Sequence, residues 1–211
     1  MIQPFEKRLR QEGGSYSLDV GIDQFFMKIG PVHQTLRKIA RKLEELGIPY
    51  AIVGGMALNA HGYERTTVDV DILVTPESLK LIHEKLDGLG YLPPFEHSKH
   101  LRDTETGVKI EFLTTGGFPG DGKPKPVAFP DPEKCAVEIG GEKYISLPTL
   151  LELKLASGMS NVTRAKDIGD VVALIKELNL LREFEDQLNP YVREKYRELW
   201  DAIDQDTSDV H

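Results

Sequence analysis

The stretch that decides the fold of this chain is residues 51–74, AIVGGMALNAHGYERTTVDVDILV. It opens with an apolar run that predicts a strand and leads straight into Gly54 and Gly55. Residues 56–61 then predict a short helix, and residues 68–74 predict a second strand. The stretch therefore indicates a strand, a glycine turn, a short helix and another strand in close succession.

Two acids, Asp69 and Asp71, alternate with apolar residues on the second predicted strand. Because successive side chains of a strand point to opposite faces, both carboxylates share one face, and Val68, Val70 and Ile72 point into the core. Two neighbouring carboxylates repel each other and raise one another's pKa unless a cation lies between them. Their oxygens suit a hard divalent ion, so the pair predicts a site for Mg²⁺ or Mn²⁺.

A third acid, Glu111, repeats this pattern in residues 108–113, VKIEFL. Its apolar neighbours occupy every second position, so Glu111 leaves the strand on the face away from the core. If the two strands lie side by side, Glu111 joins Asp69 and Asp71 in one acidic cluster. Such a triad can hold two metal ions, and Glu111 can also act as a general base toward a hydroxyl. A half-exposed strand also supplies a glutamate without any site, with Lys109 as its salt-bridge neighbour, and this alternative stays open.

Groups suited to phosphate precede the acids. Glycines between a strand and a helix let the backbone approach a ligand closely, and amide groups at a helix start bind phosphate oxygens. Gly54 and Gly55 occupy such a turn, and Arg65 and Thr67 add a positive charge and a hydroxyl. A glycine pair alone is a weak signal, because turns use it often. In this order, and together with the acids, these residues predict a nucleotide site.

The rest of the chain predicts an α/β core followed by a helical region. Residues 1–26 show no clear periodicity, and we interpret them as a loosely structured lead-in. Residues 27–145 form the predicted core. It has a helix at residues 31–46, two hairpins with turns at residues 103–107 and 140–141, and one long loop rich in Gly and Pro at residues 115–134. A loop of that length is either mobile or close to function. Residues 146–211 are expected to complete the nucleotide pocket with helices near residues 147–157, 163–178, 182–188 and 190–204. The fold class is thus α/β (α+β), a mixed sheet with flanking helices.

Charged residues of the helical region extend the predicted site. Lys154 lies among leucines, a mostly buried neighbourhood in which a lysine needs a partner, either a nucleotide phosphate or Asp167. Arg164, Asp167 and Asp170 are three residues apart and therefore share one stripe of a helix. This stripe is equally typical of a solvated helix face with paired charges, so both interpretations stay open.

Composition excludes several classes of protein. The chain has 211 residues, 40% hydrophobic and 28% charged, which is typical of a globular protein with its own core. Its net charge of -8 argues against broad binding to a nucleic-acid backbone, although a local basic patch can still dock one RNA end. No run approaches the roughly 20 apolar residues of a membrane span, so no membrane partner is expected.

Cysteine and histidine give little sign of a second metal site. The single Cys135 excludes an internal disulfide and a cysteine-based zinc site. Together with an N-terminus that lacks the apolar stretch of a signal peptide, it predicts a cytoplasmic location. His97 and His100 have no acidic motif that completes them as ligands, so we interpret them as surface histidines.

The order of the glycine pair, Asp69, Asp71 and Glu111 along the chain resembles the DNA polymerase β-like nucleotidyltransferase superfamily. In that superfamily a glycine pair precedes an Asp-x-Asp motif and a later single acid. Within it, GGMALNAHG followed by RTTVDVDILV is most similar to the AbiEii-type toxin-like transferases and their uncharacterised relatives. The resemblance puts the glycine motif and the metal carboxylates on Gly54, Gly55, Asp69, Asp71 and Glu111.

Two later motifs extend the resemblance, which spans residues 48–176. LLELKLAS is similar to the family's lysine helix, and RAKDIGDV is similar to its arginine and lysine-aspartate motif. In the family these residues line the nucleotide pocket, which here implies Lys154, Arg164, Lys166, Asp167 and Asp170.

The resemblance implies an enzyme that uses an NTP and a divalent metal. It would move a nucleoside monophosphate to an acceptor hydroxyl and release pyrophosphate. Because relatives modify tRNA ends, proteins or antibiotics, the acceptor stays open among an RNA end, a protein and a small molecule. An antitoxin partner is expected if the chain is a toxin. The alternatives are a non-catalytic nucleotide-binding or regulatory protein on the same fold, and a hydrolase that uses the same acids.

Overall fold

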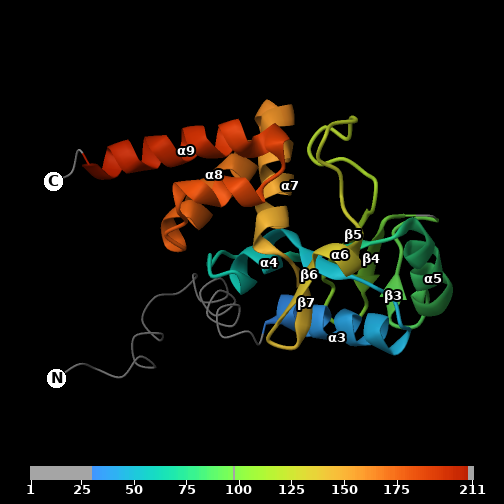
Figure 1. The fold of residues 1–211 in the computed structure, drawn as a ribbon. Coiled ribbons are helices and arrows are strands. Elements are labelled where there is room, and N and C mark those ends of the chain that lie inside the picture. The colour runs from blue at the N-terminus through green and yellow to red at the C-terminus, as the bar shows by residue number, and fades with distance from the viewer. Residues whose placement is uncertain (1–29, 97, 209–211) are drawn as a thin grey trace, which may run out of the picture.

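The computed structural model describes residues 30–96 and 98–208, and the lead-in predicted for residues 1–26 lies outside them. A seven-stranded sheet in the order β3-β4-β5-β2-β1-β7-β6 forms its centre. The strands are β1 (Ala51–Val53), β2 (Asp69–Val74), β3 (Tyr91–Leu92), β4 (His100–Asp103), β5 (Lys109–Thr114), β6 (Ala136–Ile139) and β7 (Glu142–Ile145). The sheet is mixed, because β2 pairs with β5 and β1 with β7 in parallel, while the other neighbours are antiparallel. With the flanking helices, it confirms the predicted fold class (Figure 1).

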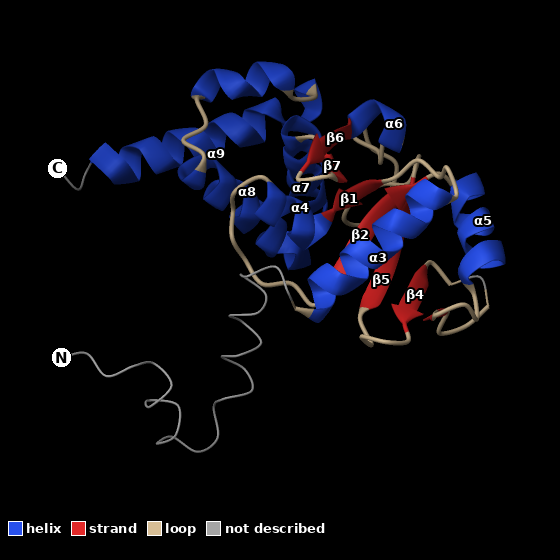
Figure 2. Ribbon diagram, turned by 90° about the horizontal axis from the view of Figure 1, so that it is seen from below, coloured by secondary structure: helices blue, strands red, loops and turns tan. Residues whose placement is uncertain are grey.

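The core helices are α3 (Pro31–Glu45), α4 (Gly54–Ala60), α5 (Pro76–Leu86) and the short α6 (Pro132–Cys135). Helix α3 lies across one face of the sheet (Figure 2), as expected from the apolar spacing of residues 31–46. Its Leu36, Ile39 and Leu43 are buried against the strands. Thr75 caps α5 as its sequence predicts, because its hydroxyl accepts a hydrogen bond from Ser78 N at 3.1 Å.

Strands β2 and β5 form the parallel pair at the middle of the sheet. Val70 and Ile72 on β2 are fully buried, as the alternation predicts. The same prediction is wrong for Val68, whose residue surface is 82% exposed. The reason is that β2 begins only at Asp69, so Val68 precedes the strand and does not follow its alternation.

The two predicted hairpins are present as β4–β5 and β6–β7. Two elements of the core were not predicted. Helix α6 lies within the stretch expected to be loop, and Asp131 caps it by accepting a hydrogen bond from Glu133 N. Strand β3 has only two residues, which is too short for any alternation to show in the sequence.

The helical region contains α7 (Leu147–Ser160), α8 (Ala165–Glu177) and α9 (Pro190–Ser208), with 3₁₀ turns η1 (Val162–Arg164) and η2 (Arg182–Gln187) between them. Helix α7 contacts both α8 and α9, so the three helices pack together beside the sheet (Figure 1). The predicted break after α8 is confirmed at Asn179, which has φ 49°. In the part of the chain that the structure describes, no helix combines the length and apolar character needed to span a bilayer.

A buried carboxylate ties α3 to the β4–β5 hairpin. The side chain of Asp103 is fully buried and accepts hydrogen bonds from Lys38 Nζ at 2.9 Å, Thr35 Oγ1 at 3.3 Å and the Glu105 amide at 3.0 Å. Although burial opposes ionisation, these partners lower the pKa of Asp103 below its ordinary value. The charged form of Asp103 therefore stabilises the packing of α3 on the sheet.

We expect Asp103→Asn to lower the free energy of unfolding by about 2 kcal/mol at pH 7, because buried donors lose a charged acceptor. Since the pKa is lowered in the folded state, the contribution is present above the unfolded value of about 3.9 and is lost as the pH falls further. The difference between wild type and variant should therefore shrink between about pH 4 and pH 2 in urea titrations. The matched control is Glu105→Gln, which removes the exposed second partner of Lys38 and should have little effect. Equal losses for the two variants would contradict this account.

Candidate active site

The acids predicted from the sequence lie on one face of the sheet. Asp71 on β2 and Glu111 on β5 are direct register partners, and Asp69 is the register partner of Lys109. Thr67 donates its hydroxyl to Asp69 Oδ1 at 2.9 Å. The pleat sets the direction of each side chain, and the pairing of β2 with β5 puts the three carboxylates on the same face of two neighbouring strands.

The surroundings of Asp71 disfavour the ionised form of its carboxyl group. Burial raises its pKa to about 7, the charges of Asp69 and Glu111 act in the same direction, and Lys109 and Lys154 oppose them. A divalent cation beside these oxygens would favour the ionised form. Among residues 30–96 and 98–208, no three His, Cys, Asp or Glu side chains are arranged as a complete set of metal ligands.

Glu111 contacts two basic side chains. Lys109 Nζ donates a hydrogen bond to Glu111 Oε2 at 2.6 Å, and His100 Nε2 lies 3.6 Å from the same oxygen. Burial works toward a higher pKa, but the hydrogen bond and charge of Lys109, with His100 after it, lower the pKa of Glu111 below its ordinary value. The interpretation of His100 as a surface histidine missed this contact, because only the pairing of β4 with β5 places it opposite Glu111.

Gly54 and Gly55 form the first turn of α4, directly after β1. Gly54 has φ +62°, and a Cβ there would lie 2.0 Å from Asp71 Oδ2. A Cβ on Gly55 would lie 2.8 Å from the Cβ of Thr67. The glycine pair thus allows the backbone of α4 to approach the acids at a point where larger residues would collide.

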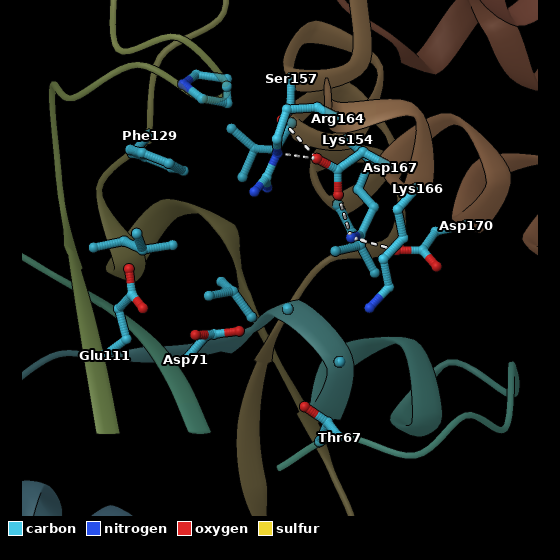
Figure 3. Close-up of a pocket in the computed structure, with 18 of the residues that line it drawn as sticks. Thr67, Asp71, Glu111, Phe129, Lys154, Ser157, Arg164, Lys166, Asp167 and Asp170 are labelled. Atoms are coloured by element: carbon cyan, nitrogen blue, oxygen red, sulfur yellow. Dashed lines mark hydrogen bonds and ion pairs between the residues drawn. The ribbon is translucent and has the colours of Figure 1, made fainter. Parts of the chain in front are cut away.

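A network of buried charges joins the sheet to the helical region. Lys154 Nζ on α7 lies 2.8 Å from Asp167 Oδ1 and 2.6 Å from Asp170 Oδ2, both on α8. Arg65, from the segment between α4 and β2, lies 2.7 Å from Asp170 Oδ1. Arg164 Nε donates to Asp167 Oδ2 at 2.8 Å, and Figure 3 shows Lys154, Arg164, Asp167 and Asp170 on the wall opposite Asp71. Of the two partners considered for Lys154, the structure supplies Asp167.

The alternative of a solvated helix face is wrong for Asp167 and Asp170. Both residues are buried, with 6% and 4% of their surface exposed. They face α7 because Lys154 and Ser157 project toward them, and Ser157 donates its hydroxyl to Asp167 Oδ2 at 2.6 Å. Arg164 is the exposed member, since 53% of its side chain is accessible. The three-residue spacing predicts a shared stripe, but only the packing of α8 against α7 decides which way that stripe faces.

One cavity of about 550 Å³ collects these groups. All the residues predicted for the site line it, namely Gly54, Gly55, Arg65, Thr67, Asp69, Asp71, Glu111, Lys154, Arg164 and Asp167. Lys166 and Asp170 line it as well, and Lys166 extends into the space between the walls (Figure 3). The structure thus brings together residues that are spread over more than half of the chain.

The long loop after β5, residues 115–134, forms a further wall of the cavity, and the sequence pattern does not indicate which of its residues do so. Phe118, Pro119 and Phe129 line the cavity, and Phe129 lies above Glu111 (Figure 3). The base of the loop is closed by hydrogen bonds from Phe129 N to Gly117 O at 2.8 Å and from Gly116 N to Phe129 O at 2.9 Å. From the sequence, a loop of this length is expected to be either mobile or close to function. Its position beside the candidate site agrees with closeness to function.

A mixed sheet that presents paired acids beside a glycine turn, with a cationic helical wall opposite, belongs to the nucleotidyltransferase class of folds. A family model described as uncharacterised nucleotidyltransferase matches residues 25–149, more than half of the 211-residue chain, so the chain belongs to this family. The protein is therefore an enzyme of nucleotidyl transfer. No curated protein matches the sequence.

Solved structures agree with this fold. The crystal structure of ANT(2″)-Ia in complex with adenylyl-2″-tobramycin is similar, with a TM-score of 0.51, 14% sequence identity and coverage of 78% of this chain and 96% of that one. The solution structure of the antibiotic-resistance factor ANT(2″)-Ia matches with a TM-score of 0.50, 15% identity and coverage of 82% and 95%. At such low identity the likeness shows the fold alone.

We expect Gly54→Ala to cost more stability than Gly47→Ala. Gly47 has a similar φ of +64°, but no heavy atom beyond its chain neighbours lies within 4 Å of a Cβ there. Gly47→Ala should lower the free energy of unfolding by about 1–2 kcal/mol, the cost of the left-handed backbone. Gly54→Ala should lose clearly more, because Asp71 must also move. Urea denaturation measures both losses, and equal values would argue against the collision.

We expect Asp170→Asn to lower the free energy of unfolding by about 3 kcal/mol, because Arg65 loses its carboxylate and Lys154 keeps only one. The control is Asp201→Asn, the same chemical change in the partly exposed pair with Arg182. Its urea midpoint should stay close to that of the wild type. A midpoint for Asp170→Asn that matches the control would show that the buried network contributes little.

Proposed function

We propose that this protein transfers a nucleoside monophosphate from an NTP to an acceptor hydroxyl and releases pyrophosphate, with a divalent cation held at Asp69 and Asp71. The observation that carries the proposal is the placement of Asp69, Asp71 and Glu111 on adjacent strands, at the base of a cavity whose opposite wall is cationic. Such a cavity offers one side to the metal and the reacting hydroxyl and the other to phosphate.

The residues present fit a hard divalent cation. Their donors are carboxylate oxygens, the ligands that Mg²⁺ and Mn²⁺ prefer, and burial and neighbouring charge leave Asp71 with a raised pKa that a cation would lower. When bound, the metal would neutralise charge on the triphosphate and polarise the reacting phosphoryl group. Asp69, oriented by Thr67, and Asp71 would hold it, and Glu111 would complete the acid set and accept the proton of the hydroxyl.

The remaining residues would bind the nucleotide. Gly54 and Gly55 line the cavity and would offer backbone amide groups to phosphate at the start of α4. Arg65, Thr67, Lys154 and Arg164 supply positive charge and a hydroxyl around the same cavity. Asp167 and Asp170 would orient these cations rather than touch phosphate, because they already accept their hydrogen bonds. Lys166, also on this wall, adds a further positive charge that extends into the cavity.

The acceptor and the cellular role belong to the same proposal. The likeness to AbiEii-type toxin-like transferases favours a toxin that modifies an RNA end or a protein and is neutralised by an antitoxin. The fold is shared with ANT(2″)-Ia, whose crystal structure contains an adenylylated antibiotic, which keeps a small-molecule acceptor open. A cytoplasmic location, expected from the lone Cys135, fits each of these acceptors.

We expect Mg²⁺-dependent NTP binding by the intact protein, measured by isothermal titration with each NTP in turn. Asp69→Asn and Asp71→Asn should weaken it by about 100-fold or more, because each removes a charged oxygen ligand of the metal. Asp201→Asn makes the same chemical change at a residue that does not line the cavity, and it should bind as the wild type does. Binding that is absent from the wild type, or that survives both site variants, would overturn the proposal.

A second measurement separates transfer from mere binding. The protein is incubated with each α-labelled NTP and a cell extract, and the label is followed into RNA, protein and small molecules. Transfer names the acceptor class, and Asp71→Asn should abolish it. Tight Mg²⁺-dependent binding without transfer would favour a regulatory protein on this fold, and release of free labelled nucleotide would favour a hydrolase.

A further inference from the structure

A lysine lies inside the acidic face of the sheet. The register of β2 and β5 sets Asp69 opposite Lys109 and Asp71 opposite Glu111, so these four charged residues form two neighbouring cross-strand pairs. Lys109 and Glu111 are two residues apart on β5, and the pleat therefore points both side chains to the same face. Lys109 Nζ lies 2.6 Å from Glu111 Oε2, which places a positive charge beside Glu111 on the acidic face.

The three carboxylates are consequently not equivalent. Glu111 Oε2 meets Lys109 from its own strand and His100 from β4, at 2.6 and 3.6 Å. Among residues 30–96 and 98–208, the side chain that donates a hydrogen bond to Asp69 is the neutral hydroxyl of Thr67. Within the described residues Asp71 forms no ion pair and accepts no side-chain hydrogen bond. Among the described residues, Lys109 thus forms its ion pair with Glu111, while Asp69 and Asp71 form none and Asp71 feels Lys109 and Lys154 only as nearby charges.

The charge of this face matches one divalent ion. When all three carboxylates are ionised, as a bound cation favours, they and the one ammonium group carry two net negative charges, which a single Mg²⁺ or Mn²⁺ neutralises. A second ion on Glu111 would have to displace the hydrogen bond from Lys109 and would then lie against a like charge, which repels it strongly at that range. Two-metal sites, by contrast, need carboxylate oxygens that are free to be shared between ions about 3.5–4 Å apart.

We propose, on the basis of the function proposed above, that Lys109 is the built-in counter-ion of Glu111 and limits the acidic face to one protein-held divalent cation. That cation belongs to Asp69 and Asp71. Glu111 carries no metal and faces the acceptor hydroxyl, with Lys109 holding its carboxylate in place. Lys109 is in this sense a positioning residue, and it decides between the one-metal and two-metal forms of the site.

The test counts Mn²⁺ bound to the full-length protein without nucleotide, from the electron paramagnetic resonance signal of free Mn²⁺. We expect one ion per chain in the wild type and two in Lys109→Gln, because Glu111 becomes available as a ligand. Lys109→Arg keeps the charge and should bind one. The matched control is Lys80→Gln, an exposed lysine on α5 with the same loss of charge, which should also bind one.

Two further variants test separately which carboxylates bind the metal ion. Glu111→Gln should still bind one Mn²⁺, because Glu111 is not its ligand, whereas Asp71→Asn should lose it. These counts hold even if Lys109→Gln fails to fold, which a thermal unfolding curve would reveal. If Glu111→Gln loses the ion, or the wild type binds two, or folded Lys109→Gln binds one, the inference is wrong while the proposed function stands. If the wild type binds no Mn²⁺ without nucleotide, the inference is wrong, and the titration with Mg²⁺ and NTP described above decides separately whether the proposed function stands.

Discussion

The parallel pairing of β2 with β5 is the interaction on which the site depends. One register places Asp71 beside Glu111 and at the same time buries Ile72 and Phe112 on the opposite face. A shift by one residue would turn the acids into the core and expose the apolar side chains, which makes the register strongly specified. The hydrophobic effect that folds the sheet therefore also sets the spacing of the carboxylates, without any energetic contribution from a ligand.

Charge in the cavity is arranged as local compensation. Lys109 forms an ion pair with Glu111 on the sheet. Lys154 and Arg65 both form ion pairs with Asp170 on the opposite wall. Buried charges are tolerated only when they are paired and hydrogen-bonded, so this pairing is what allows so many of them to surround one cavity. Cations that are paired with carboxylates keep their position on the helical wall. On the sheet, burial and the charges of Asp69 and Glu111 together raise the pKa of Asp71, and Lys109 and Lys154 offset this only in part.

Local rules explain most of what could be predicted from the sequence. The two-residue spacing of Asp69 and Asp71 predicts a shared face because the pleat has a period of two. The apolar spacing after Pro31 predicts α3, and Thr75 with Pro76 predicts the start of α5. The ordered string around Gly54 predicts the class of fold. Val68 marks the limit of this reasoning, because alternation does not say at which residue a strand begins.

Only the tertiary structure decides contacts between elements far apart along the chain. Nothing near Asp170 in the sequence indicates Arg65 as its partner, and nothing near His100 indicates Glu111. The same holds for the direction of the stripe on α8, because helical periodicity gives the stripe but not the neighbour that covers it. The sequence by itself thus determined the elements, their faces and the chemical groups on them. The packing of strands and helices decided which of those groups meet, because that choice depends on burial of the whole core rather than on any local pattern.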